Sequence, residues 1–249
     1  MVVAAADAHL VVAAVVVAAI AVVAVNNQPY RSRKMLQENC RTDAAQSEIT
    51  ARISSCRNSC HGTDVAGCLY IMRHGRTDWN VLKKLQGRTD IPLNEEGRAM
   101  AENAREEYKD VHFDVCYCSP LVRARETAQI VLRGRNIPII FDDRLIEMSF
   151  GIYEGVENAY KNPDCPMINF FSAPENYVPG KGGESFDELF ARTGNFLHEV
   201  VEPKLAEGKD VLIVGHGAMN SSIICQVKKI PLANFWDAGI ENCKLKKLL

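Results

Sequence analysis

The chain has 249 residues, of which 47% are hydrophobic and 24% are charged, and its formal net charge is -2. This length accommodates one sizeable α/β domain with an appendage, and it is too short for two full domains of ordinary size. Neither the charge nor a basic stripe indicates a nucleic-acid partner, so we expect no nucleic acid among the partners.

An apolar segment opens the chain. Leu10–Val25 is uninterrupted, with Asp7 and His9 ahead of it, and it is slightly shorter than the ~20 residues that span a bilayer. Residues 1–25 are therefore predicted to be a membrane anchor or a cleaved leader, and a misassigned start site is a third alternative. As an anchor, residues 2–25 would associate with a membrane. The basic residues follow the run, which by the positive-inside rule places the domain after it in the cytoplasm.

The next segment, residues 26–67, is polar and lacks sustained apolar periodicity, so we predict a poorly ordered linker. Cys56, Cys60 and His61 fall within it, but they lack the paired cysteine knuckles of a zinc site, and we predict no metal. The chain has nine cysteines, an odd number, and several lie in apolar runs where cysteine acts as a small core residue. This pattern indicates a reducing compartment for the folded part.

Apolar strand patterns alternate with amphipathic helix patterns over residues 68–249, which predicts one folded domain. Such alternation is typical of a three-layer α/β fold, in which a mostly parallel sheet carries helices on both faces. The predicted strands are Leu69–Met72, Asp114–Cys118, Ile137–Phe141, Asp210–Val214 and a closing strand, Asn242–Leu248. The predicted helices are Glu95–Tyr108, Leu121–Leu132, Ser185–Val201 and Ala218–Lys229.

Local signals indicate where these helices begin and end. Asn94 is a predicted N-cap, and so is Ser119, with Pro120 at the first helical position after it. Pro203 is expected to stop or kink the long third helix. Residues 142–183 are irregular and end in a connection rich in Pro, Asn and Gly, which suits a loop over a site.

Two of the strands end in the same way, with a histidine beside glycine. The first leads into Arg73-His74-Gly75 and the fourth into Gly215-His216-Gly217. Arg123 follows the second strand, in the first turns of a helix, and Glu147 follows the third. Because the ends of parallel strands meet at one edge of a sheet, these side chains are expected to converge on the rim where open α/β sheets bind ligands.

Arginines, histidines and a carboxyl in one place indicate phosphoryl transfer. Guanidinium groups hold a phosphate through several charge-assisted hydrogen bonds, more rigidly than lysine does. Arginines beside an imidazole disfavour its protonated form, which leaves a His74 nitrogen available to attack phosphorus. Arg73, Arg123 and His216 would meet the negative charge of the transition state. Glu147 is the predicted general acid for the leaving group and then the base that activates water.

Four motifs carry these residues in order along the chain. They read Arg73-His74-Gly75-x-Thr77-x-x-Asn80, Ser119-x-Leu121-x-Arg123-Ala124-x-x-Thr127-Ala128, Leu145-x-Glu147-x-x-Phe150-Gly151-x-x-Glu154-Gly155 and Gly215-His216-Gly217. From about Leu69 onward the chain resembles the histidine phosphatase superfamily, in its phosphoglycerate mutase-like branch. This resemblance implies a metal-independent mechanism without a cofactor, through a phosphohistidine on His74, with Arg73, Arg123 and His216 in the phosphate pocket and Glu147 as proton donor.

The resemblance implies further binding residues. Asn80 matches a phosphate-contacting asparagine of the family, and Thr77, Gln86 and Gly87 would belong to the same site. Gly182-Gly183-Glu184-Ser185 is similar to the phosphatase-type members. The connection between the third motif and these glycines is short, whereas the mutases carry a longer basic insert, and a short cover favours hydrolysis.

The predicted function is therefore a phosphatase that hydrolyses a small phosphomonoester, with a small phosphorylated metabolite as its partner. A 2,3-bisphosphoglycerate-dependent phosphoglycerate mutase is the first alternative. An inactive binding module or membrane-tethered regulatory module is the second. Trp79 is predicted to be a packing residue and Arg125 a solvated one. The sequence leaves the substrate and the oligomeric state open.

Overall fold

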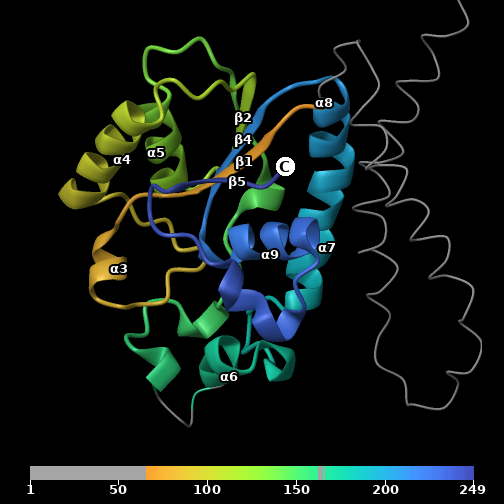
Figure 1. The fold of residues 1–249 in the computed structure, drawn as a ribbon. Coiled ribbons are helices and arrows are strands. Elements are labelled where there is room, and N and C mark those ends of the chain that lie inside the picture. Colours follow the sequence, from red (N-terminus) through yellow and green to blue (C-terminus); the bar gives the residue numbers. More distant parts are fainter. Residues whose placement is uncertain (1–65, 162–164, 166) are drawn as a thin grey trace, which may run out of the picture. The chain divides into compact units, whose positions relative to one another are not determined.

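A computed structural model describes residues 66–161, 165 and 167–249 (Figure 1). The predicted apolar segment 1–25 and nearly all of the predicted linker 26–67 lie outside the described residues. At the start of the described part, the Gly67 amide donates to the Leu205 carbonyl at 3.0 Å. Within this described part, no helix has both the length and the apolarity needed to cross a membrane.

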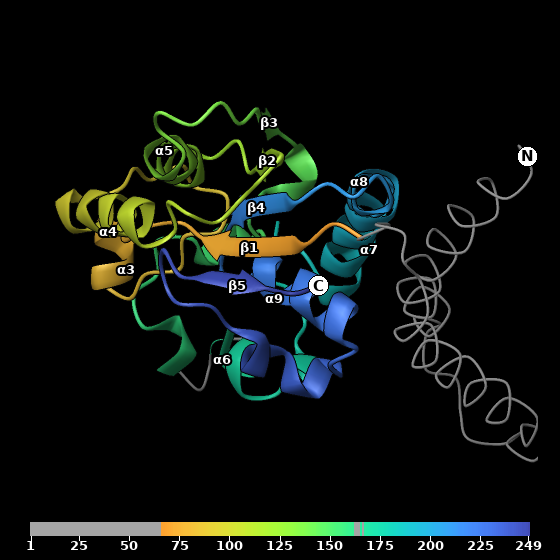
Figure 2. The ribbon, with the colours of Figure 1, turned by 45° about the horizontal axis from the view of Figure 1, so that its top comes forward.

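The centre of the domain is a five-stranded sheet with the strand order β3-β2-β4-β1-β5 (Figure 2). The first four strands run parallel to their neighbours, and β5 is antiparallel to β1. Their bounds are β1 Leu69–Arg73, β2 Val115–Cys118, β3 Ile139–Phe141, β4 Val211–Gly215 and β5 Leu245–Lys247. Arg73 pairs with Gly215 in the register of β1 and β4, so the two histidine motifs leave the sheet side by side. The mostly parallel sheet predicted from the sequence is confirmed.

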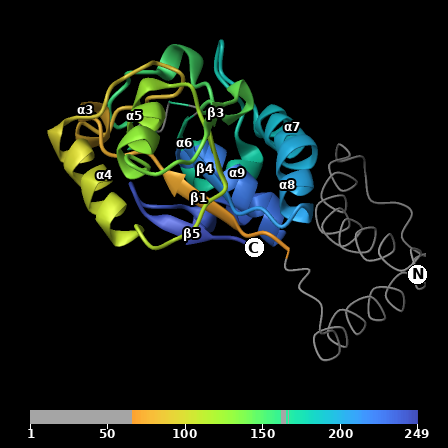
Figure 3. The same cartoon turned by 90° about the horizontal axis from the view of Figure 1, so that it is seen from above.

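Helices cover both faces of this sheet, as predicted. Val211 and Ile213 of β4 belong to one hydrophobic cluster, and Leu212 and Val214 to the other. Because successive side chains of a strand point to opposite faces, the fully buried β4 separates two layers of helices. Figure 3 shows α4 and α5 on one side and α7, α8 and α9 on the other. These helices are α4 Glu95–Glu107, α5 Val122–Val131, α7 Phe186–Phe196, α8 Glu202–Ala206 and α9 Gly217–Lys228.

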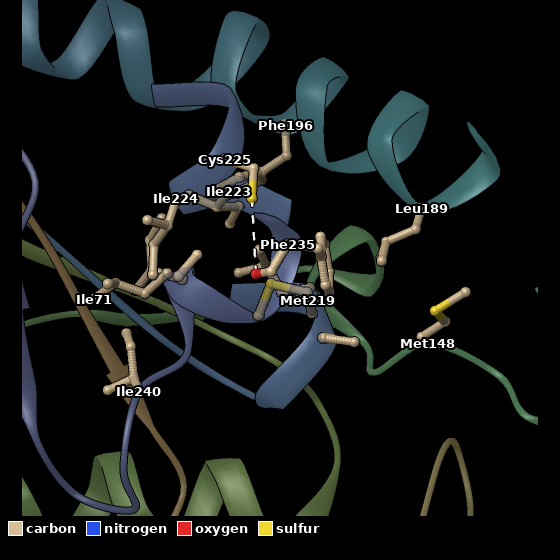
Figure 4. Packing of buried hydrophobic residues seen from close by; sticks show 14 of the residues in the cluster. Ile71, Met148, Leu189, Phe196, Met219, Ile223, Ile224, Cys225, Phe235 and Ile240 are labelled. Atoms are coloured by element: carbon tan, nitrogen blue, oxygen red, sulfur yellow. Dashed lines mark hydrogen bonds between the residues drawn. The ribbon is translucent and has the colours of Figure 1, made fainter. Parts of the chain in front are cut away.

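The larger cluster packs α9 between the sheet and α7 (Figure 4). Ile71 of β1, Phe196 of α7 and Met219 and Ile223 of α9 are all fully buried in it. Full burial of a side chain of this kind stabilises the fold by about 1.5–3 kcal/mol. Since α9 is anchored along its length, its first turn is held firmly at the rim where β4 ends.

The predicted N-cap of α5 is wrong and its predicted start is one residue early, whereas the predicted start of α4 is confirmed. Asn94 accepts from the Gly97 amide at 2.8 Å and caps α4. Helix α5 begins after Leu121, which makes no side-chain cap. Ser119 lies two residues before Leu121; its hydroxyl accepts from the Leu121 amide at 3.3 Å and lies 2.7 Å from Nε2 of His216. The hydroxyl that the local sequence pattern assigned to the helix therefore also serves as the hydrogen-bond partner that the buried His216 imidazole needs.

Pro203 does not stop the long third helix. The chain passes from α7 through a π-helical turn, Leu197–Val201, directly into α8. Pro203 lies in the first turn of α8, where proline is tolerated because the amide hydrogen it lacks has few partners there. Of the two predicted effects of Pro203, a stop or a kink, the stop is therefore wrong, and a wider π turn takes the place of a helix end.

The irregular stretch after β3 consists of short helical turns around one small helix. Helix α6 is Met167–Ser172, and the 3-10 turns are η1 Asp143–Leu145, η2 Gly151–Tyr153, η3 Ala159–Lys161 and η4 Pro174–Asn176. Two further short elements are α3 Asp78–Val81, after β1, and η6 Leu232–Ala238, after α9. α3 directly follows β1, and η6 follows α9, the helix that begins where β4 ends.

Candidate active site

The loop after β1 is held in close contact with the helices beside it. The His74 amide donates to the Gly215 carbonyl at 2.9 Å, and the Gly75 amide donates to Oγ1 of Thr127 at 3.0 Å. A Cβ on Gly75 would lie 2.5 Å from the Gly97 carbonyl oxygen, so only glycine fits there. These contacts place the His74 ring next to the first turns of α5 and α9.

The hydrogen bond of His74 decides which ring nitrogen is free. Nδ1 lies 2.6 Å from the Gly75 carbonyl oxygen. A carbonyl only accepts, so Nδ1 carries the hydrogen and Nε2 keeps its lone pair. Burial, together with the charges of Arg123 and Arg73, lowers the pKa of His74 well below 6.5. The ring is therefore neutral at physiological pH, which is the state that a nucleophilic imidazole needs.

His216 has the opposite tautomer. Arg123 Nε donates to Nδ1 of His216 at 3.2 Å, and a guanidinium only donates. The hydrogen is therefore on Nε2, which donates to the Ser119 hydroxyl. Burial and the Arg123 charge lower the pKa of His216 as well. The two imidazole rings lie 5.2 Å apart between centroids.

Arg123 is fully buried and held by the loop that follows α3. Its Nη2 donates to the Gly87 carbonyl at 2.7 Å, and its Nη1 donates to the Thr89 carbonyl at 2.9 Å. Glu154 in turn holds this loop, because its carboxylate accepts from the Thr89 amide at 2.9 Å. Burial lowers the pKa of Arg123 to about 10, so the guanidinium stays charged at neutral pH.

Arg73 differs from Arg123 in having donors to spare. Its Nη1 makes one long hydrogen bond, 3.4 Å, to the Ile240 carbonyl. Its Nε is buried and has no acceptor among the described residues. A buried N–H without a partner is costly, and a guanidinium in this state is suited to an anionic oxygen from a ligand.

The Glu147 carboxylate lies against the first turn of α9. Its Oε1 accepts from the amides of Met148 and Met219, each at 2.9 Å. Its Oε2 has only a longer contact, 3.3 Å, with the Ala218 amide. A Cβ added to Gly217 would lie 3.6 Å from this Oε2 and equally far from Cζ of Arg73. Oε2 is therefore the less engaged oxygen and faces the Arg73 guanidinium.

A capping box orients the polar residues of α3. Oγ1 of Thr77 accepts from the Asn80 amide at 3.2 Å and lies 2.9 Å from Oε1 of Gln86. Oδ1 of Asn80 accepts from the Thr77 amide at 3.1 Å. This leaves the Nδ2 group of Asn80 without a partner among the described residues, as a donor for a ligand.

A pocket of about 400 Å³ lies over these groups. Of the predicted site residues, those that line it are Arg73, His74, Asn80, Gln86, Gly87, Arg123 and Glu147. His216 and Thr77 are fully buried behind this lining and contact it through Arg123, Asn80 and Gln86. The structure thus brings together every residue that the four motifs placed in the site.

Almost all of the part of the chain that the structure describes matches a known family. The sequence profile of the histidine phosphatase superfamily (branch 1) covers residues 69–249. This chain belongs to that superfamily. It is 31% identical over 176 residues to phosphoserine phosphatase 1 of Hydrogenobacter thermophilus, covering 70% of this chain and 82% of that protein. It is 33% identical over 166 residues to a 2,3-bisphosphoglycerate-dependent phosphoglycerate mutase of Cytophaga hutchinsonii, covering 65% and 78%.

The fold matches as well. The solved structure of YhfR from Bacillus stearothermophilus superimposes with a TM-score of 0.67 at 34% identity, covering 73% of this chain and 90% of that one. The predicted family, fold and enzyme class, a phosphatase-type hydrolase, are therefore confirmed. The superfamily includes both phosphatases and phosphoglycerate mutases that act on small phosphorylated substrates.

Sequence reasoning missed several residues that support the site of this superfamily member. The sequence offered a signal for Thr127, which lies one helical turn after Arg123 in the second motif, but its role was not predicted. Its hydroxyl donates to the Arg123 carbonyl at 2.7 Å. Asn242 gave no signal, yet its side chain donates to the His74 carbonyl at 2.6 Å from the far end of the chain. Trp79, predicted to be a packing residue, lines the pocket.

Sequence reasoning also missed the role of the Glu184 carboxylate, which supports the segment that carries Glu147. It is 7% exposed and accepts from Nε of Arg192 at 2.6 Å and from the Ser149 amide at 3.3 Å. Arg192 also donates to the Arg144 carbonyl at 2.6 Å. Arg88 completes the group, donating to the Glu147 carbonyl and pairing with Glu184 at 3.3 Å. This network holds both sides of the segment that carries Glu147.

No group of His, Cys, Asp and Glu side chains in the described ranges is arranged to hold a metal ion. Cys56, Cys60 and His61 lie outside those ranges.

Proposed function

We propose that this protein is a phosphatase that hydrolyses a small phosphomonoester through a phosphohistidine on His74. The observation that carries the proposal is a neutral imidazole with a free Nε2 in the same pocket as an arginine whose buried Nε–H has no partner among the residues that the structure describes. A phosphoryl group supplies what both lack, because its phosphorus is an electrophile and its oxygens accept hydrogen bonds.

In the first step, Nε2 of His74 attacks phosphorus, the N–P bond forms and the P–O bond to the leaving group breaks. Arg73 donates to the equatorial oxygens, with Asn80 at the same pocket. Arg123 contributes charge and its two remaining N–H groups, since three are held by His216, Gly87 and Thr89. In this scheme His216 orients Arg123 from behind the pocket.

Glu147 moves the protons. In its acid form it donates a proton from Oε2 to the leaving oxygen as the P–O bond breaks. In the second step its carboxylate takes a proton from a water molecule, the resulting hydroxide oxygen bonds to phosphorus, and the P–N bond breaks to release inorganic phosphate. The contacts of Oε1 with the Met148 and Met219 amides leave Oε2 as the oxygen for this exchange.

The test is to trap the intermediate with 4-nitrophenyl phosphate, whose acidic leaving group needs no proton. With Glu147→Gln we expect the phosphoenzyme to accumulate, because only the second step then requires the carboxyl. Quenching in alkaline denaturant preserves the acid-labile phosphohistidine, and peptide mass spectrometry should place the phosphate on His74. His74→Ala should give no adduct, and His112→Ala, whose side chain is 72% exposed, serves as the matched control.

Two other outcomes would replace the proposal. Interconversion of phosphoglycerates that depends on 2,3-bisphosphoglycerate, without net release of phosphate, would identify a mutase, which one similar protein is named to be. Rates on a panel of phosphoesters no higher than those of His74→Ala would indicate a binding or regulatory module.

A further inference from the structure

The outer part of the pocket has an aromatic wall, which we define as Phe150, Phe170, Phe171 and Trp236. These residues come from the segment after Glu147, from α6 and from η6, and none of them belongs to the phosphate-binding group. The rings of Phe171 and Trp236 stack with centroids 5.1 Å apart and an interplanar angle of 23°. Phe171 is 38% exposed, so part of this stacked surface is accessible to a ligand.

The rings of the aromatic wall pack against one another, and their side chains offer no free hydrogen-bond donor. The indole Nε1 of Trp236, its single polar group, donates to the Phe170 carbonyl at 2.7 Å. Phe170 is 1% exposed and stacks on Phe186, with centroids 5.4 Å apart. A hydroxyl-rich or amino-acid leaving group would find no polar partner on this surface, whereas a flat apolar ring would gain stacking and burial.

The rest of the outer lining carries positive charge. Trp79, Lys83 and Lys84, from α3 and the turn after it, line the same pocket. Lys83 is exposed and Lys84 half-buried, and neither forms an ion pair with any of the described residues. Glu147 is the one acidic residue of the lining among the described residues. The pocket thus combines aromatic rings with two unneutralised ammonium groups.

We propose that the leaving group of the natural substrate is an aromatic ring that carries a second anionic group, such as a carboxylate. This inference rests on the phosphatase function proposed above. With the phosphoryl group at His74, the ring lies against the aromatic wall and the acid group meets Lys83 and Lys84. Small aliphatic phosphoesters fill only the inner end of the pocket.

The test compares substrates whose leaving oxygens are chemically alike. Benzyl phosphate and ethyl phosphate both release an alcohol, so a difference between them reports binding of the ring and not leaving-group acidity. We expect kcat/KM for benzyl phosphate to exceed that for ethyl phosphate at least about tenfold. 4-Carboxybenzyl phosphate should be better again by roughly threefold, and O-phosphoserine and 3-phosphoglycerate should be poorer than either benzyl ester.

Paired variants separate the two parts of the proposal. Phe171→Ala should lower the benzyl-to-ethyl ratio of kcat/KM by about threefold to tenfold, while Phe141→Ala, a phenylalanine 46% exposed on β3, should leave the ratio unchanged. The double variant Lys83→Ala with Lys84→Ala should abolish the preference for 4-carboxybenzyl over benzyl phosphate. Lys109→Ala, at an exposed position outside the pocket, is its control.

The outcomes are distinguishable from failure of the proposed function. Phosphohistidine formation with a benzyl-to-ethyl ratio near one, or a ratio insensitive to Phe171→Ala, overturns this inference and leaves the phosphatase intact. A ratio of about ten that Phe171→Ala lowers supports the aromatic part, and loss of the carboxyl preference in the lysine double variant supports the anionic part. Absence of hydrolysis for every ester overturns both proposals.

Discussion

Replacing Glu184 by glutamine should weaken the domain far more than replacing a similar glutamate at the surface. The Glu184 carboxylate receives Nε and Nη2 of Arg192 at 2.6 and 3.0 Å, with side-chain exposures of 8% for the glutamate and 16% for the arginine. Removing the charge leaves the Arg192 guanidinium buried without its counter-ion. Losing one partner of such a pair costs about 3–5 kcal/mol, and glutamine keeps one acceptor oxygen, so we expect a loss of about 3 kcal/mol.

Glu199→Gln is the matched control. Glu199 also pairs with an arginine, Arg144, at 2.6 Å, but its side chain is 64% exposed. An exposed pair is worth less than about 1 kcal/mol. Urea unfolding monitored by circular dichroism gives both free energies, and Glu184→Gln should also lower the midpoint of thermal unfolding by roughly 6–12 °C.

The same variant reports on catalysis. Arg88, Arg192 and the Ser149 amide hold the segment around Glu147 through Glu184, so displacement of this segment should lower kcat roughly tenfold with little change in KM. If Glu184→Gln unfolds at the same urea concentration as Glu199→Gln and keeps its kcat, the positioning role argued for this network is refuted.

Three further predictions concern the site itself. The pKa values of His74 and His216 in the folded chain lie below 6.5, so below that pH the unfolded chain binds protons that the folded chain excludes. As the pH is lowered, the unfolding free energy should therefore decrease by up to ~1.4 kcal/mol per pH unit for each ring. His216→Asn should remove about half of this joint slope, measured by urea titration from pH 7 to 5. An unchanged slope would show that His216 is already protonated in the fold. Arg123→Lys should lower kcat/KM by about 10²–10³-fold, because an ammonium cannot reach His216, Gly87 and Thr89 together; steady-state kinetics within threefold of the parent would contradict this. Gly217→Ala should raise the unfolding free energy by about 0.5 kcal/mol. It should also weaken inhibition by phosphate, because the new methyl lies 3.6 Å from both Arg73 and Glu147, where the phosphate is placed. Stronger inhibition by phosphate would argue against this placement.

Prediction from sequence succeeded where the signals are local. An apolar run that ends in Arg73-His74-Gly75 has to leave the sheet at a strand end, and the second run does the same before His216. The strands were predicted to within about two residues, except for the closing strand, which is shorter than expected. The residues predicted for the site lie together in the structure because each lies at a fixed distance from a strand or helix end.

Prediction failed where a distant partner competes with the local signal. Ser119 has the pattern of an N-cap, but the helix begins after Leu121, and the Ser119 hydroxyl is also the partner of His216, far along the chain. Trp79 was predicted to be a packing residue, and only the position of α3 beside the pocket makes its side chain part of the lining. Asn242 carries no local motif, and its bond to the His74 carbonyl depends on β5 returning antiparallel to β1.

The sequence by itself therefore determined the family of this protein and the residues of its candidate site: two histidines, two arginines and a carboxyl at the ends of consecutive elements, in the order of the histidine phosphatase superfamily. Residue type and spacing are sufficient for this, because strand and helix periodicity places side chains at strand ends without knowledge of the neighbours. Only the tertiary structure decided which histidine nitrogen is free, which arginine has donors to spare and which aromatic rings line the pocket. These depend on hydrogen bonds and packing between segments far apart in sequence, such as Arg123 with His216 and Trp236 with Phe170, and no local pattern encodes them.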